Sequence, residues 1–150
     1  MARNPVARRA RRSARCSASL GAGLAVALAA VPAQAQEPQP MPEDLEALRW
    51  EARPVLIFAD TPADPDYQGQ LEALETAAEG LEARDMVVLV DADPAAGGAL
   101  RERLDVQGFA AVLIGKDGGV KLREPHPVAP LELFALVDRM PMRRREMQAD

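Results

Sequence analysis

The sequence contains few nucleophiles. Its single cysteine is Cys16 and its last serine is Ser19, so residues 20–150 contain neither amino acid, and threonine occurs only at Thr61 and Thr76. Thiol-disulfide exchange requires cysteine, and a serine triad requires serine. The absence of both excludes these two reaction classes for residues 20–150.

Aromatic residues are also scarce, because there are five in 150 residues and none alternates with a basic cluster. Removing residues 1–35 removes six of the 18 basic side chains and none of the 23 acidic ones, which leaves a net charge of about −11. Such a chain is repelled by nucleic-acid phosphates and by anionic lipid. The composition therefore argues against nucleic acid and a membrane surface as partners.

The N-terminal segment has the pattern of a secretory signal peptide. Six arginines and no acidic residue precede Cys16, an apolar run covers Leu20–Val31, and Ala33-Gln34-Ala35 follows. This run is shorter than the roughly 20 residues that span a bilayer. We predict a signal peptide at residues 1–35 and export to the periplasm or the medium. Arg11-Arg12 also fits twin-arginine export, so the route stays open.

The rest of the chain predicts one α/β domain. Residues 36–44 are rich in proline and polar side chains, which predicts a flexible linker to a domain at residues 45–147. Two successive strand-helix units favour parallel strands, and the turn at Lys116–Gly119 between two apolar runs predicts a hairpin. The expected order is β-α-β-α-β-β-α. Its strands are 55–59, 86–90, 109–114 and 120–123, and its helices are 67–80, 98–104 and 130–140.

The stretch Val106–Val120 carries a motif that resembles the end of a thioredoxin domain. A glycine, an apolar residue, three further apolar residues and a Lys-Asp-Gly turn occur in that order. The exception is Ala110, which stands where thioredoxin domains have a cis-proline. We expect its peptide bond to be trans, because a cis bond before a non-proline residue costs about 2.5–4 kcal/mol. The chain thus resembles a thioredoxin-like three-layer sandwich that lacks both the cis-proline and the Cys-x-x-Cys pair.

Three stretches, Leu48–Ala59, Leu113–Arg123 and Met140–Glu146, resemble a narrower family. It is an uncharacterised secreted thioredoxin-like domain family of bacteria, shared with the animal matrix proteins equarin and the sushi-repeat proteins. The oxidoreductase activity suggested for that family rests on fold analogy, and the missing cysteines argue against carrying it over. The resemblance implies the family-motif residues Lys116, Asp117, Gly118, Met140, Pro141, Met142 and Arg143.

Acidic residues follow both predicted parallel strands. Asp60 follows the first strand, and Asp91 and Asp93 follow the second, so we expect them at the sheet edge where open α/β sheets bind ligands. One interpretation is a cluster that holds a divalent cation; the favoured one is helix caps and turns. Calcium-loop spacing is absent, and we predict no resident metal or cofactor. The predicted ligand-edge residues are Asp60, Thr61, Asp64, Asp66, Asp91, Asp93 and Ala110.

Other polar residues receive structural interpretations. His126, the only histidine, is expected in a surface loop, although it could serve as a base for Thr61. Met140 and Met142 could bind Cu(I) through their thioethers, but core packing is the favoured interpretation. Lys116 and Lys121 are expected to be solvated, and the three arginines at 143–145 are expected to pair with acidic residues of the chain.

These observations favour a non-redox binding or assembly module with an unknown protein or small-molecule ligand. No catalytic residue is assigned. The alternatives are a cysteine-independent enzyme at the acidic edge and an envelope protein that handles copper or a divalent cation. Lys121 and Arg123 alternate along the last predicted strand and protect its edge, so we expect a monomer.

Overall fold

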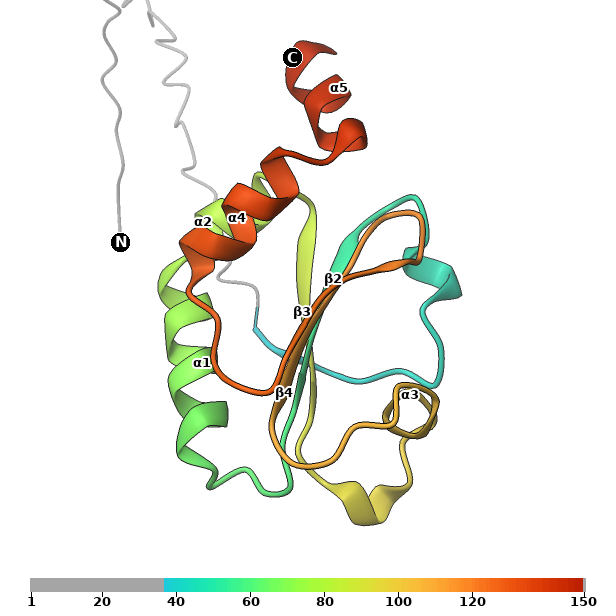
Figure 1. Ribbon diagram of the computed structural model, residues 1–150, viewed down its shortest axis with the longest axis vertical. Helices are drawn as coiled ribbons and strands as arrows, with labels where there is room; N and C mark the ends of the chain where they lie inside the picture. Colours follow the sequence, from blue (N-terminus) through green and yellow to red (C-terminus); the bar gives the residue numbers. More distant parts are fainter. Residues whose placement is uncertain (1–36, 150) are drawn as a thin grey trace, which may run out of the picture. The chain divides into compact units, whose positions relative to one another are not determined.

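A computed structural model describes residues 37–149, and the predicted signal peptide, residues 1–35, lies outside the described residues. Figure 1 shows one mixed sheet covered by helices. The strands are β1 (Gln39–Pro40), β2 (Arg53–Phe58), β3 (Met86–Asp91), β4 (Ala110–Ile114) and β5 (Val120–Glu124). The helices are α1 (Pro65–Thr76), α2 (Ala78–Glu82), α3 (Ala99–Arg103), α4 (Pro130–Asp138) and α5 (Pro141–Ala149), with short 3-10 helices at Glu46–Leu48 and Pro94–Ala96.

The sheet has the order β1-β3-β2-β4-β5. β2 and β3 are parallel, β4 runs antiparallel to β2, and β4 and β5 form the predicted antiparallel hairpin. The predicted strand directions and the α/β sandwich are therefore confirmed. β2 is the central strand, because it pairs with β3 on one side and with β4 on the other. Loops that connect other strands therefore surround both of its ends.

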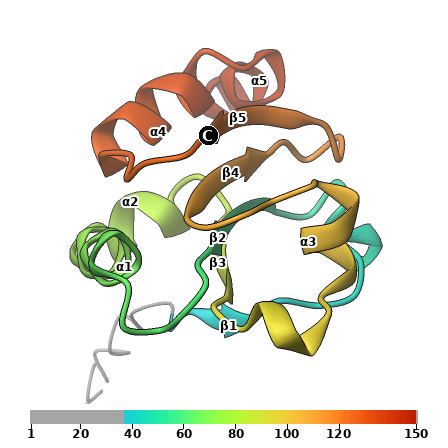
Figure 2. The ribbon, with the colours of Figure 1, turned by 60° about the horizontal axis from the view of Figure 1, so that its bottom comes forward.

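Helices cover both faces of the sheet. Figure 2 shows α1, α2 and α4 on one side of the sheet and α3 on the other. Successive side chains of a strand point to opposite faces, so Val55 and Ile57 enter the core beneath α1 and α4, while Leu56 and Phe58 enter the core beneath α3. All four side chains are buried. This two-sided burial explains the unbroken apolar run of β2.

The predicted first helix is divided in two. Asp64 caps α1 by accepting hydrogen bonds from two backbone N–H groups, and Pro65 occupies the first helical position. The helix stops at Ala77, which has non-helical dihedral angles, and α2 follows. Buried Gln70 binds the N–H and the carbonyl of Val128 with its amide group, at 2.6 and 3.0 Å. These bonds fix α1 to the segment before α4.

Residues 36–44 were expected to be a flexible linker, and the structure adds a short strand in this segment. Gln39–Pro40 forms β1, which pairs in parallel with β3, and the Met41 N–H binds the Val90 carbonyl at 3.0 Å. Met41 also packs against the core beneath α3, together with Leu45. The unpaired edge of β3 supplies the hydrogen bonds, and a proline is tolerated because β1 is itself an edge strand.

The C-terminal end also differs from the expectation. The last predicted helix, 130–140, corresponds to α4, which ends at Asp138. A further helix that was not expected, α5, follows almost at once, with Pro141 at its first position. No side chain of α5 is fully buried. The helix is therefore held by polar contacts rather than by an apolar face. Of residues 37–149, no helical segment has the length and apolarity required to cross a bilayer.

Two helical glycines provide a matched test of packing. A Cβ at Gly80 would lie 2.5 Å from the Phe134 ring, whereas a Cβ at Gly69 would meet nothing within 4 Å. We expect Gly69→Ala to raise the free energy of unfolding by about 0.5–1 kcal/mol through its higher helix propensity. Gly80→Ala should lower it by about 1–3 kcal/mol by overpacking. Urea denaturation measures both, and equal effects would contradict the α2–α4 packing.

Candidate functional site

At the carboxyl edge of the parallel strands, Asp60 and Asp91 converge on a buried arginine. Arg101 of α3 is 7% exposed. Its Nε and Nη2 each lie 3.1 Å from an Asp91 carboxylate oxygen, and its Nη1 lies 3.6 Å from Asp60 Oδ1. Nη2 also donates to the backbone carbonyls of Ala59 and Asp91 at 2.6 and 2.9 Å. The guanidinium lies 5.4 Å from the ring centre of Phe58. The two predicted carboxylates are therefore engaged with a cation of the protein itself.

The other predicted edge residues serve turns and helix ends. Asp64 accepts from the N–H groups of Asp66 and Tyr67, at 2.8 and 3.2 Å, and Asp93 accepts from Ala95 at 3.1 Å. The Thr61 hydroxyl accepts from the N–H two residues on, at 3.3 Å. These bonds match the capping interpretation. Ala110, at the start of β4, is buried and pairs with Phe58 in the sheet, while Asp66 is an exposed residue of the first turn of α1.

Arg101 was missed because charged residues are ordinarily exposed. The sequence indicated the burial of Arg101 only weakly, through its position next to the apolar Leu100 in a short helix. Gly98 provides the room, because a Cβ there would lie 2.8 Å from Asp91 Oδ2. Burial, followed by the negative charge of Asp91, raises the pKa of Tyr67 in α1. The carboxyl edge thus contains the Arg101–Asp91 salt bridge and the uncharged phenol of Tyr67.

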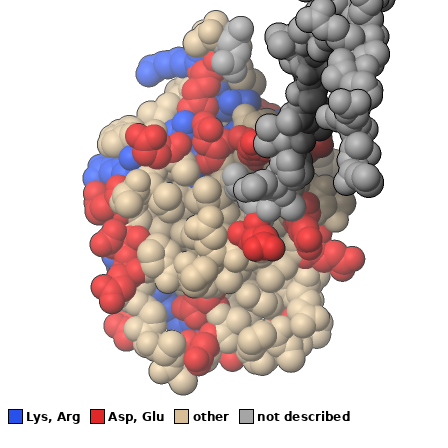
Figure 3. Space-filling view, turned by 180° about the vertical axis from the view of Figure 1, so that it is seen from behind, with Lys and Arg blue, Asp and Glu red and all other residues tan. Residues whose placement is uncertain are grey.

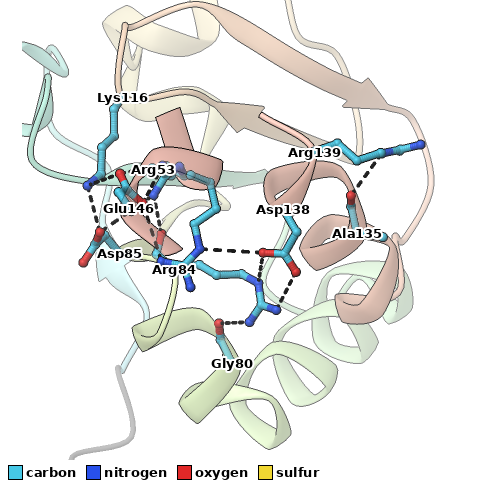
Figure 4. Close-up of polar contacts among 10 residues, drawn as sticks. Arg53, Gly80, Arg84, Asp85, Lys116, Ala135, Asp138, Arg139 and Glu146 are labelled. Atoms are coloured by element: carbon cyan, nitrogen blue, oxygen red, sulfur yellow. Dashed lines mark hydrogen bonds and ion pairs between the residues drawn. The ribbon is translucent and has the colours of Figure 1, made fainter. Parts of the chain in front are cut away.

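At the opposite end of the sheet lies a second buried arginine. Arg53, the first residue of β2, is 1% exposed. Its Nη2 donates to both carboxylate oxygens of Glu146, at 2.9 and 3.1 Å, and its Nη1 donates to the Arg84 carbonyl at 2.8 Å. Asp85 lies 3.8 Å from the same guanidinium. Figure 4 shows these partners gathered around Arg53 from α5 and from the turn before β3.

Lys116 completes this group, so the expectation that it is solvated is wrong. Its side chain is 11% exposed, and its Nζ lies 2.8 Å from Asp85 Oδ2 and 3.0 Å from Glu146 Oε1. Burial lowers the pKa of Lys116, but the hydrogen bonds to the two carboxylates outweigh burial and raise the pKa above its usual value. Burial raises the pKa of Glu146, but hydrogen bonds from Arg53 and Lys116 outweigh burial and lower the pKa to about 2.

A further ion pair joins α4 to the same region. Arg84 donates to both oxygens of Asp138, at 2.9 and 2.7 Å, and its guanidinium lies 4.5 Å from the ring centre of Phe134. Arg143 lies 3.7 Å from Asp138 and 3.5 Å from Glu146. Arg143 thus pairs with acidic residues of the chain, as expected, but Arg144 and Arg145 form no ion pair among residues 37–149. Together these contacts fix α5 against the amino end of the sheet.

A pocket of about 360 Å³ lies between the β4–β5 turn and the start of α5. Its polar wall contains four basic side chains and one carboxylate, and its apolar wall consists of Met140, Pro141 and Met142. Five of the seven predicted family-motif residues therefore line one cavity, whereas Gly118 and Arg143 do not. The basic residues are Arg53, Lys116, Lys121 and Arg145, and the carboxylate is Asp117.

The structure does not favour a copper site. His126 is exposed, with its Nε2 3.2 Å from Glu124, and it does not line the pocket that contains Met140 and Met142. The basic side chains beside the two thioethers outnumber their carboxylate partners among residues 37–149, and an excess positive charge would repel a copper cation. Among residues 37–149, no group of three or more histidine, cysteine or acidic side chains is placed to hold a metal ion.

Comparison with known proteins identifies the family. A family model described as "Domain of unknown function (DUF4174)" matches residues 44–146. The chain belongs to this family. This chain is 28% identical over 141 residues to "Coiled-coil domain-containing protein 80" of Danio rerio. That match covers 74% of this chain but only 16% of the relative, so this chain spans less than a fifth of the relative's length.

Solved structures show the fold of the DUF4174 domain. The reduced 2-Cys peroxiredoxin of Plasmodium vivax matches with a TM-score of 0.53 at 15% identity, covering 69% of this chain and 84% of that one. The thioredoxin peroxidase I of Plasmodium yoelii matches with a TM-score of 0.52 at 17% identity, covering 71% and 81%. The domain therefore has a thioredoxin-like fold, although residues 17–150 contain no cysteine.

Replacing Arg101 tests how much its ion pair with Asp91 contributes to stability. Arg101→Met should lower the free energy of unfolding by about 3 kcal/mol, because it leaves the Asp91 carboxylate, itself only 10% exposed, without its partner. The control is Arg103→Met, an exposed position on the same helix, where we expect less than about 0.5 kcal/mol. Urea denaturation measures both changes. Equal stability of Arg101→Met and wild type would contradict the assignment.

The Glu146 contacts predict a pH dependence. The folded-state pKa of about 2 lies below the ordinary value of 4.5, so the carboxylate stabilises the fold fully above about pH 4.5, and this contribution is lost as the pH falls from about 4.5 toward 2. The stability difference between wild type and Glu146→Gln should therefore be constant near neutral pH and shrink in that acid range.

Urea denaturation of both proteins at several pH values measures this difference. Glu75→Gln, an exposed α1 position without an ion pair among residues 37–149, controls for the loss of one negative charge. A wild-type advantage over Glu146→Gln that stays the same from neutral pH to about pH 2 would show that the Arg53–Glu146–Lys116 contacts do not depend on the ionised carboxylate.

Proposed function

We propose that this DUF4174 domain is an exported, non-redox binding module. One observation carries the proposal: at the sheet edge that binds ligands in open α/β folds, Asp91 is already paired with buried Arg101, whereas a pocket of about 360 Å³ lies at the opposite end. Binding sites are concave and mostly apolar, with a few convergent polar groups. The pocket at the start of α5 has these properties.

The composition supports the absence of redox chemistry. A disulfide cycle needs thiolate sulfur, and residues 17–150 contain none. The peroxiredoxin structures that this chain resembles support only the fold, because their identity to it is 15–17%. A cysteine-independent enzyme at the carboxyl edge would need a free acid or base there, and the Asp91 carboxylate is already paired with Arg101.

Export and a monomeric state are the remaining parts of the proposal. The pattern of residues 1–35 supports export, and the loss of that segment leaves a chain without cysteine that would need no disulfide in an oxidising compartment. β5 forms one edge of the sheet, and its exposed Lys121 and Arg123 discourage strand pairing with a second copy. The partner would be a small molecule or another protein.

Expression of the full chain in a bacterium with a periplasm tests this function. We expect the periplasmic or secreted fraction to contain a species that starts at Gln36, detected by N-terminal sequencing. This species should neither reduce the disulfides of insulin nor consume peroxide in the presence of a thiol reductant, because it has no thiol. Thioredoxin and a peroxiredoxin serve as positive controls.

Two results would contradict the proposal. Retention of the uncleaved chain in the cytoplasm would remove its exported part. Turnover of either substrate by the cysteine-free species, at a rate comparable with the positive controls, would remove its non-redox part. A Cys16→Ala variant of the full chain controls for chemistry at the one thiol, which precedes the predicted cleavage site.

A further inference from the structure

The charges around the pocket at the start of α5 are not balanced. Lys121 is paired with Asp117 at 2.6 Å, and Arg53 and Lys116 share Glu146 and Asp85. The fourth basic residue of the pocket, Arg145, is exposed and makes no ion pair within residues 37–149. Within the described part of the chain, four cations therefore face three carboxylates, which leaves one positive charge at the cavity.

This positive charge contrasts with the rest of the molecule. The chain after residue 35 has a net charge of about −11. On the face seen in Figure 3, acidic side chains predominate over basic ones. The first turn of α5 contains no acidic residue, so no side chain of that turn offsets the partial positive charge of the helix amino end. A cavity with excess positive charge on an acidic protein favours an anion over a cation.

The apolar wall restricts the kind of anion. Met140, Pro141 and Met142 line the cavity together with the basic residues, and Met140 also packs against the core. Methionine side chains adapt to irregular apolar ligands. A fully hydrated inorganic anion would leave this wall unused, whereas an anion with an apolar body would cover it. A volume of about 360 Å³ is within the range of small-molecule sites.

We infer that this pocket binds a small amphiphilic carboxylate, an organic acid with an anionic head and an apolar body. The head would lie beside Arg145 and Lys121, and the body would lie along Met140 and Met142. This inference rests on the proposed function, because it names the ligand class of the same binding module. It also assigns a role to five of the seven family-motif residues, which line the cavity although they come from two segments more than 20 residues apart.

Octanoate is a suitable probe, used below its micelle-forming concentration with the full chain. Labelling the methionine methyl groups with carbon-13 gives NMR signals for Met140 and Met142 at the pocket and for Met41, which packs beneath α3, as an internal control. We expect saturable shifts of the first two signals and none of the third. Octylamine, octanol and inorganic phosphate should each bind at least about tenfold more weakly, because each lacks the charge or the apolar body.

A matched pair of variants locates the head group. Arg145→Gln should weaken octanoate binding about tenfold, whereas Arg144→Gln, an exposed neighbour that does not line the pocket, should leave it unchanged. The inference is overturned if octanoate causes no saturable shift of Met140 and Met142, if octylamine binds equally well, or if Arg145→Gln binds octanoate like wild type. Each of these results leaves the non-redox proposal intact, since only disulfide or peroxide turnover by the cysteine-free species overturns that proposal.

Discussion

The burial of the Arg53 guanidinium is the interaction on which the C-terminal part of this structure depends. An unpaired buried charge costs several kcal/mol, so the fold must bring acceptors to it. They come from the Arg84 carbonyl, from Asp85 and from Glu146 of α5, while Lys116 shares both carboxylates. Since α5 has no fully buried side chain, these polar contacts, more than apolar packing, place it against the sheet. The pocket exists because α5 is held there.

The two ends of the sheet therefore differ in their chemical character. At the carboxyl edge, buried Arg101 pairs with the largely buried Asp91 side chain and binds two backbone carbonyls, while Asp60, 3.6 Å from the guanidinium, stays exposed to solvent. At the amino end, Arg53 leaves room beside it for a cavity that basic and thioether side chains line. A thioredoxin-like fold without cysteine thus retains a concave site, but the site is displaced from the edge at which open α/β sheets ordinarily bind ligands.

Apolar patterning explains which elements could be predicted. The runs that became β2, β3 and β4 are continuous because both faces of the sheet are covered, and Asp64 before Pro65 is a local helix-start signal. β1 was missed because a strand of two residues, one of them proline, carries no periodicity. α5 was missed because it lacks a buried face and is strongly basic. In both cases no local sequence pattern predicts the element. Long-range hydrogen bonds hold β1 in place, and ion pairs hold α5.

The sequence by itself determined the absence of thiol and serine chemistry, the central α/β sandwich and the hairpin, because these follow from residue types and from short-range apolar spacing. Only the tertiary structure decided which charges are buried and which partners they have. Arg53 and Glu146 are 93 residues apart along the chain, and Lys116 and Asp85 are 31 apart. No local pattern specifies such pairs, because the partner of a charge is chosen by the packing of distant elements. The same packing brings five family-motif residues from two separate segments together as the lining of one pocket.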